Sequence, residues 1–230
     1  ESLTSYLNDD EKKIIIKAIN FSDKAHKDQI RHSGDPFITH PIEVAKILTS
    51  INLDSSAIAA GLLHDTIEDT NISKNELTEI FGNQISELVQ GLTKISKFAL
   101  KINKQKLGEN YRKLILASSK DLRVILIKLA DRLHNMRTIN FIKEESKKIN
   151  ISIETLEIFS PLAERLGMQE IRAELDDLSF KIIEPELRRS ILQRLKVLRL
   201  QDEELLEKTI KKIEELLMKN KVKAKIFGRE

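Results

Sequence analysis

Cysteine and tryptophan are absent from the 230 residues, and glycine (7), proline (4) and aromatic residues (4%) are scarce. Without cysteine, the chain has no disulfides, thiolate metal sites or cysteine nucleophiles. So few aromatic residues leave little for stacking nucleic-acid bases, and we expect no DNA binding. No apolar run approaches the roughly 18 residues of a membrane span, and the first residues show no export signal. We therefore expect a cytoplasmic protein that does not contact a membrane.

Charged residues are abundant but nearly balanced. The chain has 39 Lys and Arg residues against 36 Asp and Glu residues, which gives a net charge of +3. Both signs are mixed along the sequence, so no basic block indicates a nucleic-acid surface. With 40% hydrophobic residues, the chain can bury a core, and its length fits about one domain.

The segments between glycine and proline residues are rich in Leu, Ile, Lys and Glu, and strand-like alternation is absent before the last ten residues. This pattern predicts an all-α helical bundle. The expected helices are 9–28, 41–51, 55–69, 74–81, 83–97, 107–118, 121–138, 151–159, 170–180, 186–198 and 200–219.

The C-terminal part has a different pattern from the rest. Residues 201–220 form a long amphipathic stretch of mixed charge, which predicts a helical connector or a partner surface. Residues 221–227 alternate between polar and apolar, which predicts a short terminal strand without a partner in the chain. We expect a helical domain over 1–195, a connector over 196–220 and the start of a further domain over 221–230.

A His-Asp pair, His64–Asp65, follows an apolar run and precedes two more carboxylates, Glu68 and Asp69. Burying so many ionisable groups is costly without a partner, and a divalent metal ion is such a partner. In a continuous helix over 55–69, the four-residue spacing places His64 beside Glu68 and Asp65 beside Asp69. The two later carboxylates would then lie one turn from the metal, where they could handle its bound water.

Two other segments offer ligands of the same kind. The helix predicted over 121–138 is apolar except for one polar row formed by Asp131, Asn135 and Thr138. His40 stands at the start of another predicted helix. Taken alone, His40 is explained as a helix cap and Asp131 as half of an ion pair.

Taken together, these residues form a set of two imidazoles and two carboxylates, which suits Mn, Fe or Zn better than Ca or Mg. The candidate metal ligands are His40, His64, Asp65 and Asp131.

Three longer segments are more specific than the separate residues. They are residues 31–41 (RHSGDPFITHP), 64–70 (HDTIEDT) and 128–138 (KLADRLHNMRT). Together they resemble the hydrolase domain of the RelA/SpoT family, whose long members make and degrade the guanosine alarmones ppGpp and pppGpp. That domain belongs to the HD metal-dependent phosphohydrolases. Residues 160–168 (SPLAERLGM) resemble the segment after its metal core, so the resemblance covers essentially the whole chain.

The resemblance implies an HD-domain bundle over 1–195 that hydrolyses the 3′-diphosphate of ppGpp or pppGpp, giving GDP or GTP and pyrophosphate. It implies that His40, His64, Asp65 and Asp131 bind one Mn²⁺, that Glu68 and Asp69 position or deprotonate the attacking water, and that Arg31, His32, Ser33, Lys128, Asn135 and Thr138 line the nucleotide site. His32 departs from the family, where Lys usually follows this Arg. We expect a weaker cationic contact or pH-sensitive binding there.

The resemblance also implies an origin for the tail. Residues 226–230 (IFGRE) resemble the opening of the family's synthetase domain, so 221–230 is expected to begin a domain that is otherwise missing from this chain. Two other functions fit the residues: an HD phosphohydrolase acting on another nucleotide, and a regulatory module that binds nucleotide without hydrolysing it. The sequence leaves the oligomeric state open.

Overall fold

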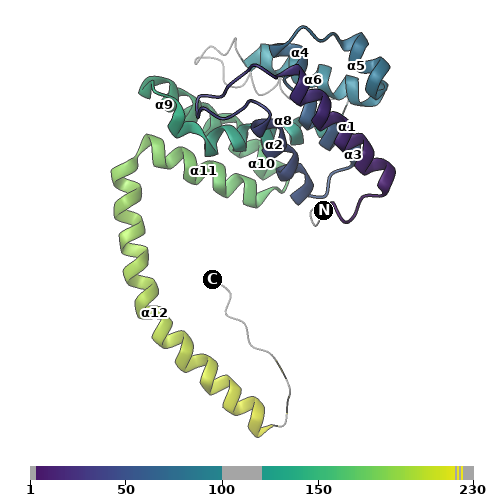
Figure 1. Cartoon of the computed structure of the whole chain (residues 1–230). Coiled ribbons are helices and arrows are strands. Elements are labelled where there is room, and N and C mark those ends of the chain that lie inside the picture. Colours follow the sequence, from purple (N-terminus) through teal and green to yellow (C-terminus); the bar gives the residue numbers. More distant parts are fainter. Residues whose placement is uncertain (1–3, 100–120, 221, 223, 225–230) are drawn as a thin grey trace. The chain divides into compact units, whose positions relative to one another are not determined.

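The computed structural model describes residues 4–99 and 121–220, together with Val222 and Ala224. The chain divides into two compact units, Glu1–Ile183 and Glu184–Glu230, and each is described here by itself. All regular structure among the described residues is helical (Figure 1), which confirms the predicted all-α class for that part of the chain. The domain boundaries at residues 195 and 220 stay predictions.

The first unit is a bundle of helices (Figure 1), and the connections that the structure describes between them are mostly short. Its elements are α1 (Asp9–Ala25), α2 (Thr39–Ser50), α3 (Ser55–Leu63), α4 (Thr66–Asp69), α5 (Lys74–Phe81), α6 (Asn83–Ala99), α8 (Arg123–Arg137), the 3₁₀ turn η1 (Ile139–Phe141), α9 (Glu145–Glu154), the π-helical turn η2 (Thr155–Phe159), α10 (Ser160–Arg165) and α11 (Gln169–Ile183).

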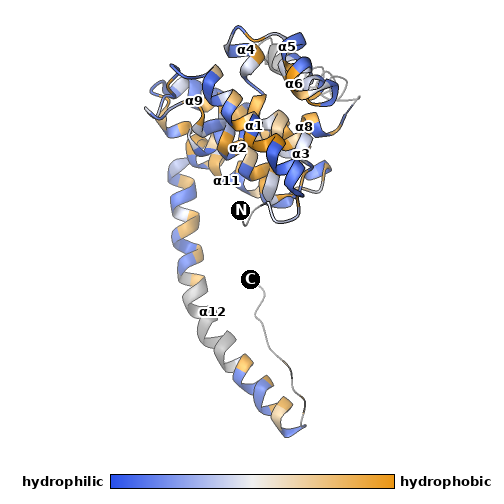
Figure 2. Ribbon diagram, turned by 45° about the vertical axis from the view of Figure 1, so that its right-hand side comes forward, coloured by the Kyte–Doolittle hydropathy of each residue, from blue (hydrophilic) through white to orange (hydrophobic). Residues whose placement is uncertain are grey.

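Helix α3 lies at the centre of this bundle, where it packs against α1, α2, α6 and α8. Every residue from Ala57 to Leu63 is buried, so this helix has no solvated face over that span. A Cβ atom at Gly61 would lie 2.5 Å from the Leu48 Cδ1 atom, so α2 and α3 approach closely there. Figure 2 shows hydrophobic residues gathered along the central helices. This packing brings the end of α3 next to the start of α2.

The single helix predicted over 55–69 is wrong. Helix α3 ends at Leu63, His64 and Asp65 form a turn, and a second short helix, α4, follows. The reason is local competition for backbone carbonyls: His64 Nδ1 bonds to the Gly61 carbonyl at 2.7 Å, and Thr66 Oγ1 bonds to the Leu63 carbonyl at 2.6 Å. Glu68 and Asp69 therefore do not extend the helical faces of the His-Asp pair.

Several other predicted boundaries also differ. The helix predicted over 151–159 begins at Glu145 as α9 and continues through the π-helical turn η2 into α10, a helix that the sequence did not predict. The predicted helix 107–118 lies outside the described residues. So does the predicted strand 221–227, apart from Val222 and Ala224, which are not in a strand.

The second unit contains one long helix, α12 (Pro185–Lys219), in place of the two helices predicted over 186–198 and 200–219. No glycine or proline follows Pro185 within it, so nothing in the sequence ends the helix near residue 199. Leu187, Ile191 and Leu195 are exposed on its first turns.

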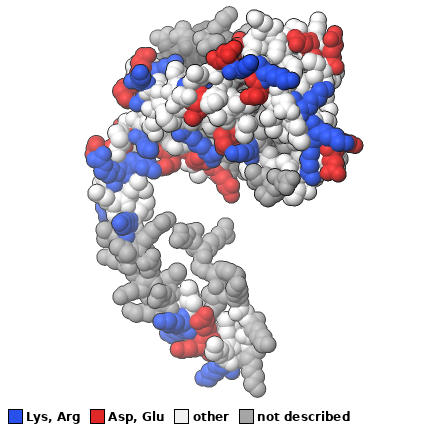
Figure 3. Space-filling model, in the orientation of Figure 1, with Lys and Arg blue, Asp and Glu red and all other residues white. Residues whose placement is uncertain are grey.

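Charge is mixed over the visible face of the first unit, where Lys and Arg alternate with Asp and Glu (Figure 3). Among the described helices, none combines the length and the apolar character needed to cross a lipid bilayer.

Candidate metal centre

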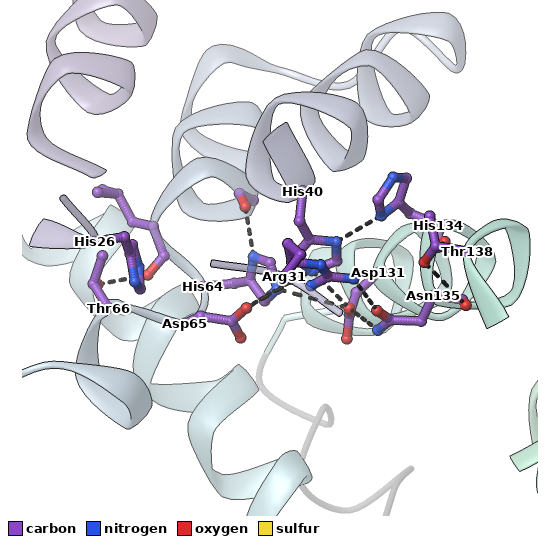
Figure 4. Close-up of polar contacts among 12 residues, drawn as sticks. His26, Arg31, His40, His64, Asp65, Thr66, Asp131, His134, Asn135 and Thr138 are labelled. Carbon is purple, nitrogen blue, oxygen red and sulfur yellow. Dashed lines mark hydrogen bonds and ion pairs between the residues drawn. The ribbon is translucent and has the colours of Figure 1, made fainter. Parts of the chain in front are cut away.

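Four side chains from three parts of the chain meet at one buried point (Figure 4). His40 comes from the first turn of α2, His64 and Asp65 from the turn after α3, and Asp131 from the middle of α8. His40 Nε2 lies 3.2 Å from His64 Nε2, 3.2 Å from Asp131 Oδ1 and 3.7 Å from Asp65 Oδ2. His64 Nε2 lies 3.0 Å from Asp65 Oδ2 and 3.7 Å from Asp131 Oδ1.

This spacing fits ligands around a common cation. Metal–ligand bonds of about 2.0–2.2 Å place neighbouring tetrahedral or octahedral ligand atoms about 2.8–3.6 Å apart. The separations of 3.0–3.7 Å fall within or beside that range. The ligand atoms of His40, His64 and Asp65 all lie within 4.8 Å of one another, which makes them a candidate metal-binding group. Asp131 Oδ1 faces both imidazoles of that group.

Further contacts orient the two imidazoles. His64 Nδ1 donates to the Gly61 carbonyl, so that in the neutral ring Nε2 keeps its lone pair toward the cluster. His40 Nδ1 lies 2.7 Å from His134 Nδ1, and both side chains are buried. Both ligand rings are therefore fixed from behind, with their Nε2 atoms turned toward the carboxylates.

The Asp131 carboxylate is held on both oxygens. Lys128 Nζ donates to Oδ2 at 2.7 Å, and Asn135 Nδ2 donates to Oδ1 at 2.6 Å. Arg31 in turn donates to Asn135 Oδ1 at 3.0 Å, which ties the loop before α2 to α8 (Figure 4). Two residues of the predicted polar row are therefore joined by hydrogen bonds: Asn135 bonds to Asp131, and Arg31 bonds to Asn135.

The electrostatics of the cluster favour an ionised Asp131 and a protonated His64. Burial acts to raise the pKa of Asp131, but Lys128 and the imidazoles outweigh it and hold that pKa well below its usual range. Burial acts to lower the pKa of His64, but Asp65 and Asp131 outweigh it and raise that pKa to about 10. Burial and the neighbouring charge of His64 lower the pKa of His40. Without a metal, the excess negative charge is thus balanced by a proton on His64.

Helix α4 carries the two further carboxylates, Glu68 and Asp69. Glu68 is half-buried and Asp69 is exposed. Burial and the charge of Asp65 raise the pKa of Asp69, which places its carboxylate in the field of the cluster. Gln29 Nε2 donates to the Asp69 carbonyl at 2.7 Å, and His26 Nδ1 donates to Gln29 Oε1 at 2.7 Å. We call residues 66–70 the acidic turn.

A cavity of about 430 Å³ adjoins the cluster. The six residues predicted to line a nucleotide site all border it: Arg31, His32, Ser33, Lys128, Asn135 and Thr138. Asp131 also borders it, so the cavity reaches one of the four candidate metal ligands. Three cationic side chains line it, including Arg132, which also pairs with Glu154 at 3.0 Å.

The structure assigns contacts to three residues that the sequence interpretation did not place in the site. His134 touches His40, Gln29 anchors the acidic turn, and Arg132 borders the cavity. A signal for His134 was available, because it follows Asp131 by three residues and so shares its helical face. For Gln29 there was none, since its partner is a backbone carbonyl 40 residues away.

Comparison with known proteins decides the family. Residues 18–169 match the model of the HD domain family. The chain belongs to this family. The chain is also similar along essentially its whole length to proteins of the Rel/SpoT type, which confirms the resemblance of the three motifs.

Two groups of relatives illustrate this similarity. The chain is 44% identical over 230 residues to "GTP pyrophosphokinase rsh" of Brucella melitensis, covering 100% of this chain and 30% of that protein. It is 41% identical over 228 residues to "Bifunctional (p)ppGpp synthase/hydrolase SpoT" of Escherichia coli, covering 99% of this chain and 32% of the relative. A protein of a second Escherichia coli strain, "Guanosine-3′,5′-bis(diphosphate) 3′-pyrophosphohydrolase", matches equally well. The chain thus spans about a third of these relatives.

A solved structure supports the fold. It is described as "A metazoan ortholog of SpoT hydrolyzes ppGpp and plays a role in starvation responses", and it matches with a TM-score of 0.58 at 25% sequence identity. The match covers 73% of this chain and 94% of the other.

Proposed function

We propose that this chain hydrolyses the 3′-diphosphate of ppGpp and pppGpp, with Mn²⁺ as its cofactor. One observation carries the proposal: a buried set of two imidazoles and two carboxylates adjoins, through Asp131, a cavity lined by Arg31, Lys128 and Arg132. The first feature suits a divalent cation and the second suits a polyanionic nucleotide. Relatives named for synthesis and hydrolysis of (p)ppGpp supply the substrate class.

In this proposal the ion is held by His40, His64, Asp65 and Asp131. A divalent ion at such a site lowers the pKa of bound water and neutralises charge on phosphoryl oxygens. Because Asp131 is fixed by Lys128 and Asn135, its ligand oxygen is already in place before substrate enters. The preformed site limits the reorganisation that the reaction requires.

Glu68 and Asp69 are proposed to position the attacking water and accept its proton. The water oxygen forms a bond to the phosphorus that carries the ribose 3′-oxygen. The bond between this phosphorus and the 3′-oxygen then breaks. The 3′-oxygen takes up a proton, and pyrophosphate leaves with GDP or GTP as the other product. The raised pKa of Asp69 makes it a better proton acceptor than an ordinary carboxylate.

The cavity residues are proposed to bind the nucleotide. Arg31 borders the cavity and donates to Asn135 on α8, so it can contact a phosphate while keeping this link. Lys128 and Arg132 offer further cationic contacts, while Ser33, Thr138 and His32 offer polar ones. The synthase activity named for a relative is not proposed for this chain, which spans about a third of that relative's length.

The test is a hydrolysis assay on the metal-free chain with added Mn²⁺ and, in parallel, with a chelator. We expect ppGpp and pppGpp to yield pyrophosphate only when Mn²⁺ is present. A cyclic dinucleotide and a deoxynucleoside triphosphate are assayed beside them. Faster turnover of either one would assign the site to another nucleotide, and bound Mn²⁺ without turnover would indicate a regulatory module.

A further inference from the structure

His134 is the side chain directly behind one of the candidate ligands. It lies three residues after Asp131 on α8, and its side chain is buried with 9% of the residue exposed. Its Nδ1 atom is 2.7 Å from His40 Nδ1, while the ring planes are tilted by 42°. Figure 4 shows this contact on the side of His40 away from Asp65.

Counting protons in this contact leaves two arrangements for neutral rings. A 2.7 Å contact between two ring nitrogens requires one hydrogen between them. If His40 donates, its proton is on Nδ1 and its Nε2 keeps a lone pair toward His64 and Asp131. If His134 donates, the proton of neutral His40 is on Nε2, where it blocks a cation. The direction of one hydrogen bond therefore decides whether His40 is a ligand.

The other ligand ring has no such choice. His64 Nδ1 bonds to the Gly61 carbonyl oxygen, which can only accept. The carbonyl therefore fixes the tautomer of neutral His64. His40 is bonded to a group that can accept or donate, so its tautomer depends on the state of His134.

We propose that His134 is a positioning residue, whose Nδ1 accepts a hydrogen bond from His40 Nδ1–H and thereby holds His40 in the metal-binding tautomer. Helix α8 then contributes two groups to the centre. Asp131 supplies a ligand oxygen, and His134 supplies the hydrogen-bond acceptor for His40. The inference rests on the metal centre of the proposed function but needs no nucleotide. Outer contacts of this type typically change metal affinity by about 10- to 100-fold.

Two variants with the same number and branching of side-chain heavy atoms help to separate the hydrogen bond from packing. His134→Asn keeps an acceptor, because Asn Oδ1 occupies the same branch position as the ring Nδ1. His134→Leu leaves a similar space but has no acceptor. The dissociation constant for Mn²⁺ is measured by calorimetry on the metal-free full chain, and thermal unfolding of each metal-free variant checks the fold.

We expect His134→Leu to weaken Mn²⁺ binding by about 10- to 100-fold and His134→Asn by less than about threefold. Equal weakening in both variants, or none in either, overturns the inference while leaving the proposed function intact. If the unaltered chain binds no Mn²⁺, the proposed function fails and the inference fails with it.

A second measurement needs no variant. In the unaltered chain loaded with diamagnetic Zn²⁺, ¹⁵N spectra of the imidazoles report which nitrogen of each ring carries hydrogen. We expect His134 to be protonated at Nε2 and unprotonated at Nδ1. A proton on His134 Nδ1 in the Zn²⁺-loaded chain overturns the proposal even if both variants fail to fold.

Discussion

The metal centre and the acidic turn are neighbours in the chain, but they are held in different ways. His40, His64 and Asp131 are only 1–5% exposed, and each contacts groups from distant segments. The acidic turn consists of the four-residue helix α4 and Thr70, and its described hydrogen bonds to other segments include those to Gln29 and to the Leu63 carbonyl. In the proposed mechanism, metal binding therefore depends on the whole bundle, whereas water handling depends on one short segment.

Removing a carboxylate ligand should have the largest effect. We expect Asp131→Ala to bind no Mn²⁺ and to show no measurable hydrolysis. It should also unfold more easily, by about 3–5 kcal/mol, because the buried partner of Lys128 is removed. Metal analysis, a ppGpp assay and urea unfolding measure the three effects.

Asp121→Ala is the matched control, since this carboxylate pairs with Arg123 at the start of the same helix but lies outside the cluster. It should keep the metal and the rate. If Asp131→Ala retains a full metal content, Asp131 is not a ligand and the two regions are not separated as described.

A change in the acidic turn should separate catalysis from metal binding. Glu68→Gln is expected to lower the hydrolysis rate by about 10²- to 10⁴-fold, because it removes a group that accepts a proton. Its Mn²⁺ affinity should stay near that of the unaltered chain. Glu76→Gln, in the exposed first turn of α5, is the control. A parallel loss of metal in Glu68→Gln would show that the turn belongs to the centre.

What could be predicted from the sequence also differs between the metal centre and the acidic turn. Residue types and their order were enough to predict His40, His64, Asp65 and Asp131, and the structure brings them together. Helix α5 was predicted with its observed bounds, because Ser73 caps it and Gly82 follows its last residue.

The break after Leu63 could not be predicted, because it depends on side chains that compete for carbonyls inside a buried turn. Residues 55–69 contain no proline, and a helical period fits them throughout. The role of Gln29 likewise depends on a contact across 40 residues, which a single sequence does not encode as a pattern. His134 differs, because its position on the same helical face as Asp131 was a readable signal even though its partner His40 is 94 residues away.

The charge balance of the centre predicts a pH effect in the metal-free chain. The pKa of His64 is about 10 in the folded chain, above its ordinary value of 6.5. Protonated His64 therefore stabilises the fold fully below about pH 6.5, and this contribution is lost as the pH rises toward 10. The lowered pKa values of Asp65 and Asp131 leave both charged across this window.

Two measurements check this effect. Urea unfolding of the metal-free chain should show a free energy of unfolding that falls between about pH 6.5 and about pH 9.5. Mn²⁺ should displace the His64 proton, so its apparent affinity should rise by up to about tenfold per pH unit. Calorimetry in two buffers of different ionisation enthalpy counts the released proton. Binding without proton release near pH 8 would contradict the assigned state of His64.

The smallest effect is expected where the acidic turn is anchored from outside. Gln29→Ala removes one hydrogen bond to the Asp69 carbonyl, which corresponds to about a 2- to 10-fold lower turnover number if the turn then samples other positions. Mn²⁺ affinity should not change, because Gln29 has no contact with the four ligands among its described hydrogen bonds. Lys27→Ala, an exposed neighbour, is the control. If Gln29→Ala weakens Mn²⁺ binding as much as turnover, the anchor positions the centre too, and the two regions form a single unit.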